Sequence, residues 1–323
     1  MKKSSIAEFE KLYNVNIPVA PEFNYYKNLL LKSAEFNYLP EALIRFEDFE
    51  KTLGPDDTIK SKKLKAMDRL VDYISGTNTY SRFINYDLNK LPRFNSLDKR
   101  NYCFIAENEF NYFVSIDIVS ANYSTMQYFF DKSNELCYDW RELCMVQDVP
   151  LVFSQSKSFR QYVFGNLNPK RNQTIQQSVI TGFVDKIQEE FGQDIIYITH
   201  DEIMLKFSDS TPIMSVESKL NEILKSGLPL KYTFFKIDHV ENKSKIIVKN
   251  ILGRDGKVIY KTLFGVPGNQ FYYYYKKYII KEKIEIRDLY FWNDNKLAIW
   301  VMNPEHQQID SEIINQAIEQ SNF

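Results

Sequence analysis

The sequence has few of the residues on which several common enzyme classes depend. It contains ten glycines and three histidines in 323 residues, and no glycine lies in the spacing G-x-G-x-x-G or G-x-x-x-x-G-K. A dinucleotide-binding fingerprint and a P-loop are therefore excluded. His200, His239 and His306 are too scattered for the zincin motif H-E-x-x-H, and no serine stands in G-x-S-x-G. The zincin and α/β-hydrolase classes are excluded as well.

Cysteines and long apolar runs are also scarce. Cys103, Cys137 and Cys144 are odd in number and have no C-x-x-C spacing, so we expect neither a disulfide framework nor a cysteine zinc site. No stretch approaches the roughly 18 uncharged apolar residues of a membrane helix, and residues 1–18 lack the apolar run of a signal peptide. We therefore expect a soluble, intracellular (cytoplasmic) protein with no membrane partner.

The charge is nearly balanced over the whole chain but not along it. Lys and Arg number 41 against 42 Asp and Glu, which by itself argues against a nucleic-acid partner. Between Asp148 and Asp185, however, there is no acidic residue, and the basic residues there are Lys157, Arg160, Lys170 and Arg171. Lys157 and Arg160 share a face if this segment is helical, where they could meet a triphosphate. An ordinary basic surface helix accounts for them equally well.

The hydrophobic pattern changes period along the chain. Helical spacing predicts helices over residues 6–13, 41–53, 62–75 and 175–191, and another that begins at Ser120. Short β-prone runs predict a strand over 112–117 and hairpins over 195–207 and 245–264. We also expect a strand over 297–302, a terminal helix over 311–320, and a half-buried strand for the aromatic run 272–275. Mixed helices and strands of this kind predict an α+β fold.

Two aspartates stand at the ends of predicted strands. Asp117 closes the strand over 112–117, and Asp201 lies at the turn of the hairpin over 195–207. Two carboxylates from separate strands are the minimum needed to hold a pair of divalent ions for phosphoryl transfer. Mg²⁺ suits such a site because this ion needs no histidine or cysteine ligand, and Mn²⁺ is the alternative. A lone aspartate is more often a simple turn or strand-end residue.

Taken in order, fragments of the chain resemble the family A DNA polymerases, the DNA polymerase I group. Upstream, Thr79-Tyr-Ser-Arg82 is similar to T-G-R-x-S, Leu88-Asn-Lys-Leu-Pro92 with Arg93 to N-L-Q-N-I-P, and Arg100 with Phe104-Ile-Ala106 to R-x-x-F-x-A. Downstream, Val114-Ser-Ile-Asp117 is similar to V-S-A-D, Arg160-Gln-Tyr-Val-Phe-Gly165 to K-x-x-x-F-G, Asn172-Gln-Thr-Ile-Gln176 to N-x-P-[IM]-Q, and His200-Asp-Glu202 to H-D-E. Their shared order, rather than any single fragment, carries the resemblance.

The resemblance implies a template-directed nucleotidyltransferase. By resemblance, Asp117 and Asp201 would bind two Mg²⁺ ions, one activating the primer 3′-hydroxyl and the other steadying the leaving pyrophosphate. Nucleoside triphosphates would be held by Lys157, Arg160 and Phe164, beside Asn122. Nucleic acid, as primer–template or single strand, would be contacted by Arg82, Arg93, Asn172, Gln176, His200 and Glu202.

The implied architecture is a polymerase palm with additions. We expect a helical thumb-like region over 1–76, a palm over 77–240 with a reduced fingers element over about 150–170, and a β-rich region with a terminal helix over 241–323. The residues between Gly165 and Asn172 are too few for normal fingers, so a second protein subunit that supplies them is left open.

Two departures from the family leave alternatives open. Asn122 stands five residues after Asp117, where the family has a glutamate that crowds the sugar 2′ position. The chain could therefore be a small RNA polymerase of the single-subunit phage type, and a viral or phage source is an open alternative. In the other alternative, Ser120-Ala-Asn-Tyr-Ser124 aligns with S-A-D-Y-S, and the chain is a palm-like subunit that binds nucleic acid or protein without catalysis.

Overall fold

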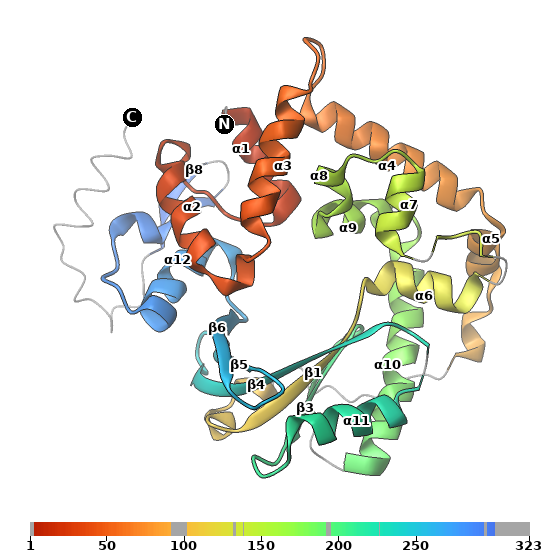
Figure 1. The fold of residues 1–323 in the computed structure, drawn as a ribbon, viewed down its shortest axis with the longest axis vertical. Coiled ribbons are helices and arrows are strands. Elements are labelled where there is room, and N and C mark those ends of the chain that lie inside the picture. The colour runs from red at the N-terminus through yellow and green to blue at the C-terminus, as the bar shows by residue number, and fades with distance from the viewer. Residues whose placement is uncertain are drawn as a thin grey trace.

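The fold is mixed α+β and combines helices with one large antiparallel sheet (Figure 1). The computed structural model describes residues 3–91, 102–131, 134–137, 139–191, 195–225, 227–293 and 296–300. The predicted α+β class is confirmed. Within the described residues, no helix combines the length and the apolar character that crossing a membrane requires.

The N-terminal quarter of the chain is helical. Its α-helices are α1 (Lys3–Tyr13), α2 (Phe23–Lys32), α3 (Leu39–Lys51), α4 (Ile59–Ser75) and α5 (Asn78–Asn85). Short 3₁₀ turns are η1 (Ala20–Glu22), η2 (Ala34–Phe36), η3 (Leu88–Lys90), η4 (Tyr102–Phe104) and η5 (Ala106–Asn108). The helices predicted over 6–13, 41–53 and 62–75 are confirmed. A reciprocal pair of hydrogen bonds between Thr58 and Ser61 caps α4 at its start.

The large sheet has six strands in the order β2-β3-β1-β4-β5-β6, and every neighbouring pair is antiparallel. The strands are β1 (Tyr112–Ile118), β2 (Ile195–Ile198), β3 (Glu202–Phe207), β4 (Leu230–Glu241), β5 (Ile246–Leu252) and β6 (Val258–Phe264). The strand predicted over 112–117 and both predicted hairpins are confirmed. Strands β5 and β6 extend the same sheet that carries Asp117, although they belong to the region predicted over 241–323.

Helices cover one face of this sheet. They are α10 (Pro169–Phe191), which runs vertically at the right of the strands in Figure 1, and α11 (Ile213–Ile223), which lies below them. Val114, Ile116 and Ile118 alternate along β1 and join the hydrophobic cluster that includes Val184 of α10 and Leu220 of α11. Because strand side chains alternate between faces, Phe113, Ser115 and Asp117 must lie on the opposite face of the sheet.

Shorter helices lie between β1 and α10 in the chain. They are α6 (Ala121–Phe130), α7 (Trp140–Val146), α8 (Leu151–Ser154) and α9 (Lys157–Gly165). The helix predicted from Ser120 is confirmed as α6. The segment 150–170, predicted as a reduced fingers element, contains α8, α9 and the first residues of α10.

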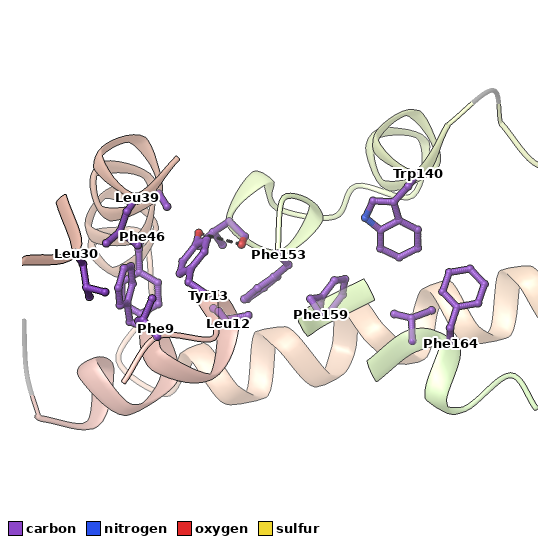
Figure 2. Close-up of a cluster of buried hydrophobic side chains, with 14 of the residues drawn as sticks. Phe9, Leu12, Tyr13, Leu30, Leu39, Phe46, Trp140, Phe153, Phe159 and Phe164 are labelled. Carbon is purple, nitrogen blue, oxygen red and sulfur yellow. Dashed lines mark hydrogen bonds between the residues drawn. The ribbon is translucent and has the colours of Figure 1, made fainter. Parts of the chain in front are cut away.

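One hydrophobic cluster joins the N-terminal helices to this short helical element. Figure 2 shows Phe9, Leu12 and Phe46 in a continuous row with Phe153 and Phe159. The Tyr13 hydroxyl donates a hydrogen bond of 3.3 Å to the carbonyl of Val152. The same cluster includes residues from all three predicted ranges, 1–76, 77–240 and 241–323. The boundaries at 76 and 240 therefore remain predictions, since this cluster of the described residues crosses both.

The C-terminal part of the described chain departs from the prediction. Its elements are η6 (Gly268–Gln270), α12 (Phe271–Tyr274), a π-helical turn η7 (Tyr275–Ile280), η8 (Ile286–Leu289), β7 (Tyr290–Asn293) and β8 (Lys296–Ile299). The prediction of a half-buried strand over 272–275 is wrong, because the four tyrosines are helical and all are buried. A helix sends successive rings in different directions, and each ring finds a neighbour: the Tyr272 ring lies 4.7 Å from Tyr26 and the Tyr273 ring 5.1 Å from Trp300. The strand predicted over 297–302 begins as β8, and residues 301–302 and 311–320 lie outside the described residues.

Candidate functional site

Strand β1 carries Asp117 to the edge of a pocket. Asp117 is the last residue of β1 on the face opposite α10, and the backbone then turns at Ser120, whose φ of 51° is left-handed. The Ser124 hydroxyl donates to the Val119 carbonyl (2.6 Å) and closes this turn. The strand therefore ends abruptly, and α6 starts beside the aspartate.

The hairpin of β2 and β3 brings Asp201 to the same place. The Thr199 hydroxyl donates to Oδ1 of Asp201 (3.0 Å), and the Ile118 amide donates to the Asp201 carbonyl (3.2 Å). Glu202, the next residue, is paired with Asp117 in the register of β1 and β3. The turn after β2 is thus tied to the last residues of β1.

Helix α9 supplies the basic side of the site. Ser156 caps this helix by accepting a hydrogen bond from the Phe159 amide (3.0 Å), and Phe159, Val163 and Phe164 are buried beneath it. The buried face holds the helix against the hydrophobic cluster of Figure 2. Lys157 is exposed and Arg160 is partly buried. The sequence places these two cations on one face only if their segment is helical, and α9 confirms that helix.

These elements enclose a pocket of about 460 Å³. Its lining contains eight of the residues singled out from the sequence, which are Asp117, Asn122, Lys157, Arg160, Phe164, Gln176, His200 and Asp201. They come from β1, α6, α9, α10 and the turn before β3. Carboxylates and cations therefore share one cavity.

The pocket makes the ionised form of Asp117 unfavourable. Burial raises the pKa of Asp117 to about 6, and the carboxylates of Glu202 and Asp201 add to the increase, while Lys157 and Lys231 oppose it. The carboxylate receives no hydrogen bond within the described residues. In contrast, Oε1 of Glu202 accepts a hydrogen bond from the Ser115 hydroxyl (2.6 Å). The negative charge at Asp117 is therefore incompletely compensated by the protein itself.

Amide side chains fix the position of Asn122. Gln176 donates from Nε2 to Oδ1 of Asn122 (2.8 Å) and to Oδ1 of Asn172 (3.2 Å), and Asn172 donates to the Asn122 carbonyl (3.3 Å). Gln176 and Asn172 are almost fully buried. Their contacts hold α6 against α10, while Asn122 faces the pocket.

Other predicted site residues lie away from the pocket lining. Arg82 donates from Nε to the Phe130 carbonyl (2.9 Å), and neither Arg82, Asn172 nor Glu202 lines the cavity. Arg93 lies outside the described residues. Nucleic-acid contacts by these four residues therefore remain predictions.

The sequence interpretation missed Lys231. This exposed lysine stands opposite Asp117 in the register of β1 and β4, lines the pocket, and lowers the pKa of Asp117. Only the β1–β4 register brings it there, so no local motif could have indicated it. Gln161 and Gln173, which also line the pocket, carried no distinguishing pattern either.

The donor set of the pocket suits a hard cation. Among the described residues, no three histidine, cysteine, aspartate or glutamate side chains lie close enough together to form a metal cluster. A metal would therefore depend on Asp117 and Asp201, with water and substrate oxygens completing its shell. Mg²⁺ is commonly bound by one or two carboxylates with waters and substrate phosphates, so these residues fit it.

Comparison of the chain with protein-family models, with curated proteins and with solved structures finds no match. The geometry of the pocket is therefore the basis for assigning a function.

Proposed function

We propose that this chain is a template-directed nucleotidyltransferase, similar to a DNA polymerase, that extends a nucleic-acid 3′ end by phosphoryl transfer. One observation carries the proposal: the lining of a single pocket contains both Asp117 and Asp201 and the cations Lys157 and Arg160. Phosphoryl transfer depends mainly on positioning and on charge stabilisation, and this pocket offers carboxylates for cations and cations for phosphates.

The basic residues would bind the triphosphate. Within the described residues, neither Lys157 nor Arg160 forms an ion pair, although the charge of Lys157 lowers the pKa of Asp117. Burial lowers the pKa of Arg160, which reflects the cost of holding this guanidinium partly away from water. An anionic ligand would offset that cost, and a guanidinium can bind phosphate oxygens in a bidentate manner.

The acidic residues would act on the reacting end. Asp117 and Asp201 would hold divalent ions, and Mg²⁺ bound there would activate the 3′-hydroxyl and stabilise the departing pyrophosphate. His200, whose Nε2 lies 3.6 Å from Oδ1 of Asp201, is about half exposed and is available to the nucleic acid. Lys231 is exposed on the same face and suits a backbone phosphate.

Primer extension tests the proposal. The wild-type chain with Mg²⁺ should extend a primer on a template, and Asp201→Asn should reduce the rate at least 100-fold. Asp209→Asn is the matched control, because Asp209 is an exposed loop residue outside the pocket. Extension that survives Asp201→Asn at the wild-type rate would refute the assignment.

The segment 150–170, which contains α8 and α9, is short for a fingers element. This shortness favours a second candidate, a palm-like subunit that binds nucleic acid or a partner protein without catalysis. In this case the wild-type chain would bind primer–template but would not extend it with either nucleotide type. Asp117→Asn would then leave binding unchanged.

A further inference from the structure

A second pocket adjoins the first and shares its two cations. It has a volume of about 670 Å³ and, like the first pocket, is lined by Lys157 and Arg160. Its walls come from the N-terminal helices, from the start of α9, and from the segment between β6 and α12. The two cavities therefore meet at the basic face of α9.

The walls of the second pocket combine aliphatic residues with aromatic and amide side chains. The aromatic residues are Tyr13, Phe36, Tyr38, Phe264, Phe271 and Tyr272, and the amides are Asn14, Asn16 and Gln155. Nδ2 of Asn16 is buried and has no hydrogen-bond partner within the described residues. Aromatic faces stack on nucleobases, and amides bind base edges, so this composition suits a base.

Charged residues are few in the lining of the second pocket. Beyond Lys157 and Arg160, no lysine or arginine lines it, and Glu35 is its single acidic lining residue. The Thr262 hydroxyl donates to the Glu35 carboxylate (3.2 Å), and Glu35 is exposed to solvent. A nucleic-acid strand would carry phosphates on both sides of each base, whereas a mononucleotide has one neutral aromatic end and one anionic end. A lining with two cations therefore favours the mononucleotide over a strand.

We propose that the second pocket is a binding site for a nucleoside triphosphate, with the base among the aromatic and amide side chains and the phosphates at Lys157 and Arg160. This site is additional to the reacting position beside Asp117. Its volume lies within the range of small-ligand pockets. The purpose of this site, which is to supply the adjoining pocket with nucleotide, rests on the proposed function. The binding itself does not, because it requires neither metal nor catalysis.

Gly268 gives a direct way to block the pocket. It lines the cavity, its φ is not left-handed, and a Cβ built on it meets nothing within 4 Å. Gly268→Phe should therefore place a ring in the pocket without backbone strain. Gly182→Phe is the matched control, because a Cβ on Gly182 also meets nothing and this residue lines neither pocket.

The test is calorimetric titration of the full chain with 2′-deoxyadenosine 5′-triphosphate in EDTA, without nucleic acid. We expect binding by the wild type, at least tenfold weaker binding by Gly268→Phe and by Arg160→Gln, and wild-type binding by Gly182→Phe. Tyr38→Ala should also weaken binding, whereas Tyr162→Ala, at a comparably exposed tyrosine outside the pocket, should not.

Three results would overturn the inference. In the first, Gly268→Phe binds the triphosphate as tightly as the wild type does. In the second, deoxyadenosine without phosphates binds as tightly as the triphosphate. In the third, a single-stranded oligothymidylate binds the wild type more tightly than the triphosphate does, and Gly268→Phe abolishes that binding. The outcome is separable from that of the proposed function. If metal-free binding is lost in Gly268→Phe while the wild type never extends a primer, the second site stands and the polymerase assignment fails.

Discussion

Asp117 and Lys231 lie directly opposite each other where β1 pairs with β4. Glu202 stands opposite Asp117 on the other side, in β3, so the Asp117 carboxylate lies between a like charge and an opposite charge on one face of the sheet. Lys231 lowers the pKa of Asp117, but burial and the neighbouring carboxylates outweigh it. The sheet thus holds Asp117 where its charge is costly until a cation joins it.

Replacement of this aspartate should stabilise the protein while it removes activity. A raised folded-state pKa means that the group favours folding below the ordinary pKa of 3.8, and that this contribution is lost as the pH rises through about 6. Asp117→Asn should therefore increase the free energy of unfolding by about 1 kcal/mol at pH 8, a figure reduced for partial exposure. Urea unfolding at pH 8 and at pH 4 measures it, and the gain should fade toward pH 4. A gain that grows at pH 4 would contradict the prediction.

The sugar selectivity should depend on Asn122. Its Oδ1 accepts a hydrogen bond from Gln176, and no carboxylate stands at this position of the pocket. We expect the wild type to use ribonucleotides as well as deoxyribonucleotides, and Asn122→Glu to lower ribonucleotide use at least tenfold, because the longer side chain would crowd the 2′-hydroxyl. The ratio of kcat/KM for the two nucleotide types measures this. Ribonucleotide synthesis without a primer would favour the RNA polymerase alternative.

The buried amide network should contribute to stability. Gln176→Leu would leave the Oδ1 atoms of Asn122 and Asn172 without their donor, which costs about 1–3 kcal/mol for buried polar groups. The same variant should raise the KM for nucleotide, because Asn122 loses one of its anchors. Gln177→Leu, on the exposed side of the same helix, is the control and should change neither quantity. Equal effects of the two variants would contradict a specific role for Gln176.

A buried ion pair should stabilise the C-terminal segment. Nζ of Lys276 lies 2.9 Å from Oδ2 of Asp288, and both side chains are almost completely buried. Lys276→Met would leave a buried carboxylate without its cation, with an expected loss of about 3–5 kcal/mol. Adding Asp288→Asn to this variant should recover part of the loss in urea unfolding.

The control for this experiment is the exposed pair of Lys257 and Asp255. Lys257→Met should give no measurable change, because solvent screens surface pairs. If Lys276→Met has as little effect, the pair does not hold the segment in place.

The sequence predicted best those parts of the site that depend on local pattern. The apolar run before Asp117, the hairpin around Asp201 and the helical spacing of Lys157 and Arg160 are all decided within a few residues. Sequence order could not show that Lys231 lies beside Asp117, because strand register is decided by tertiary pairing. Helical spacing likewise predicted that Asn172 and Gln176 share one face of a helix. It could not predict that this face contacts Asn122, because that contact depends on tertiary packing.

The aromatic segment after β6 shows how packing overrides propensity. Tyrosine favours strands, yet Phe271–Tyr274 is helical, because buried partners surround it on several sides. These partners, such as Tyr26 and Trp300, come from both ends of the described chain. No reading of residues 271–275 alone could have indicated them.

The hydrogen bonds between α2 and the C-terminal segment have a consequence for folding during synthesis on the ribosome. The Tyr26 hydroxyl donates to the carbonyl of Arg287, 261 positions later in the chain (2.9 Å), and Tyr25 bonds to Asp288. Since a chain emerges from its N-terminus, α2 cannot complete this packing until Arg287 and Asp288 have been synthesised. Helix α2 therefore presents an incompletely buried apolar face on the nascent chain until the C-terminal segment has formed.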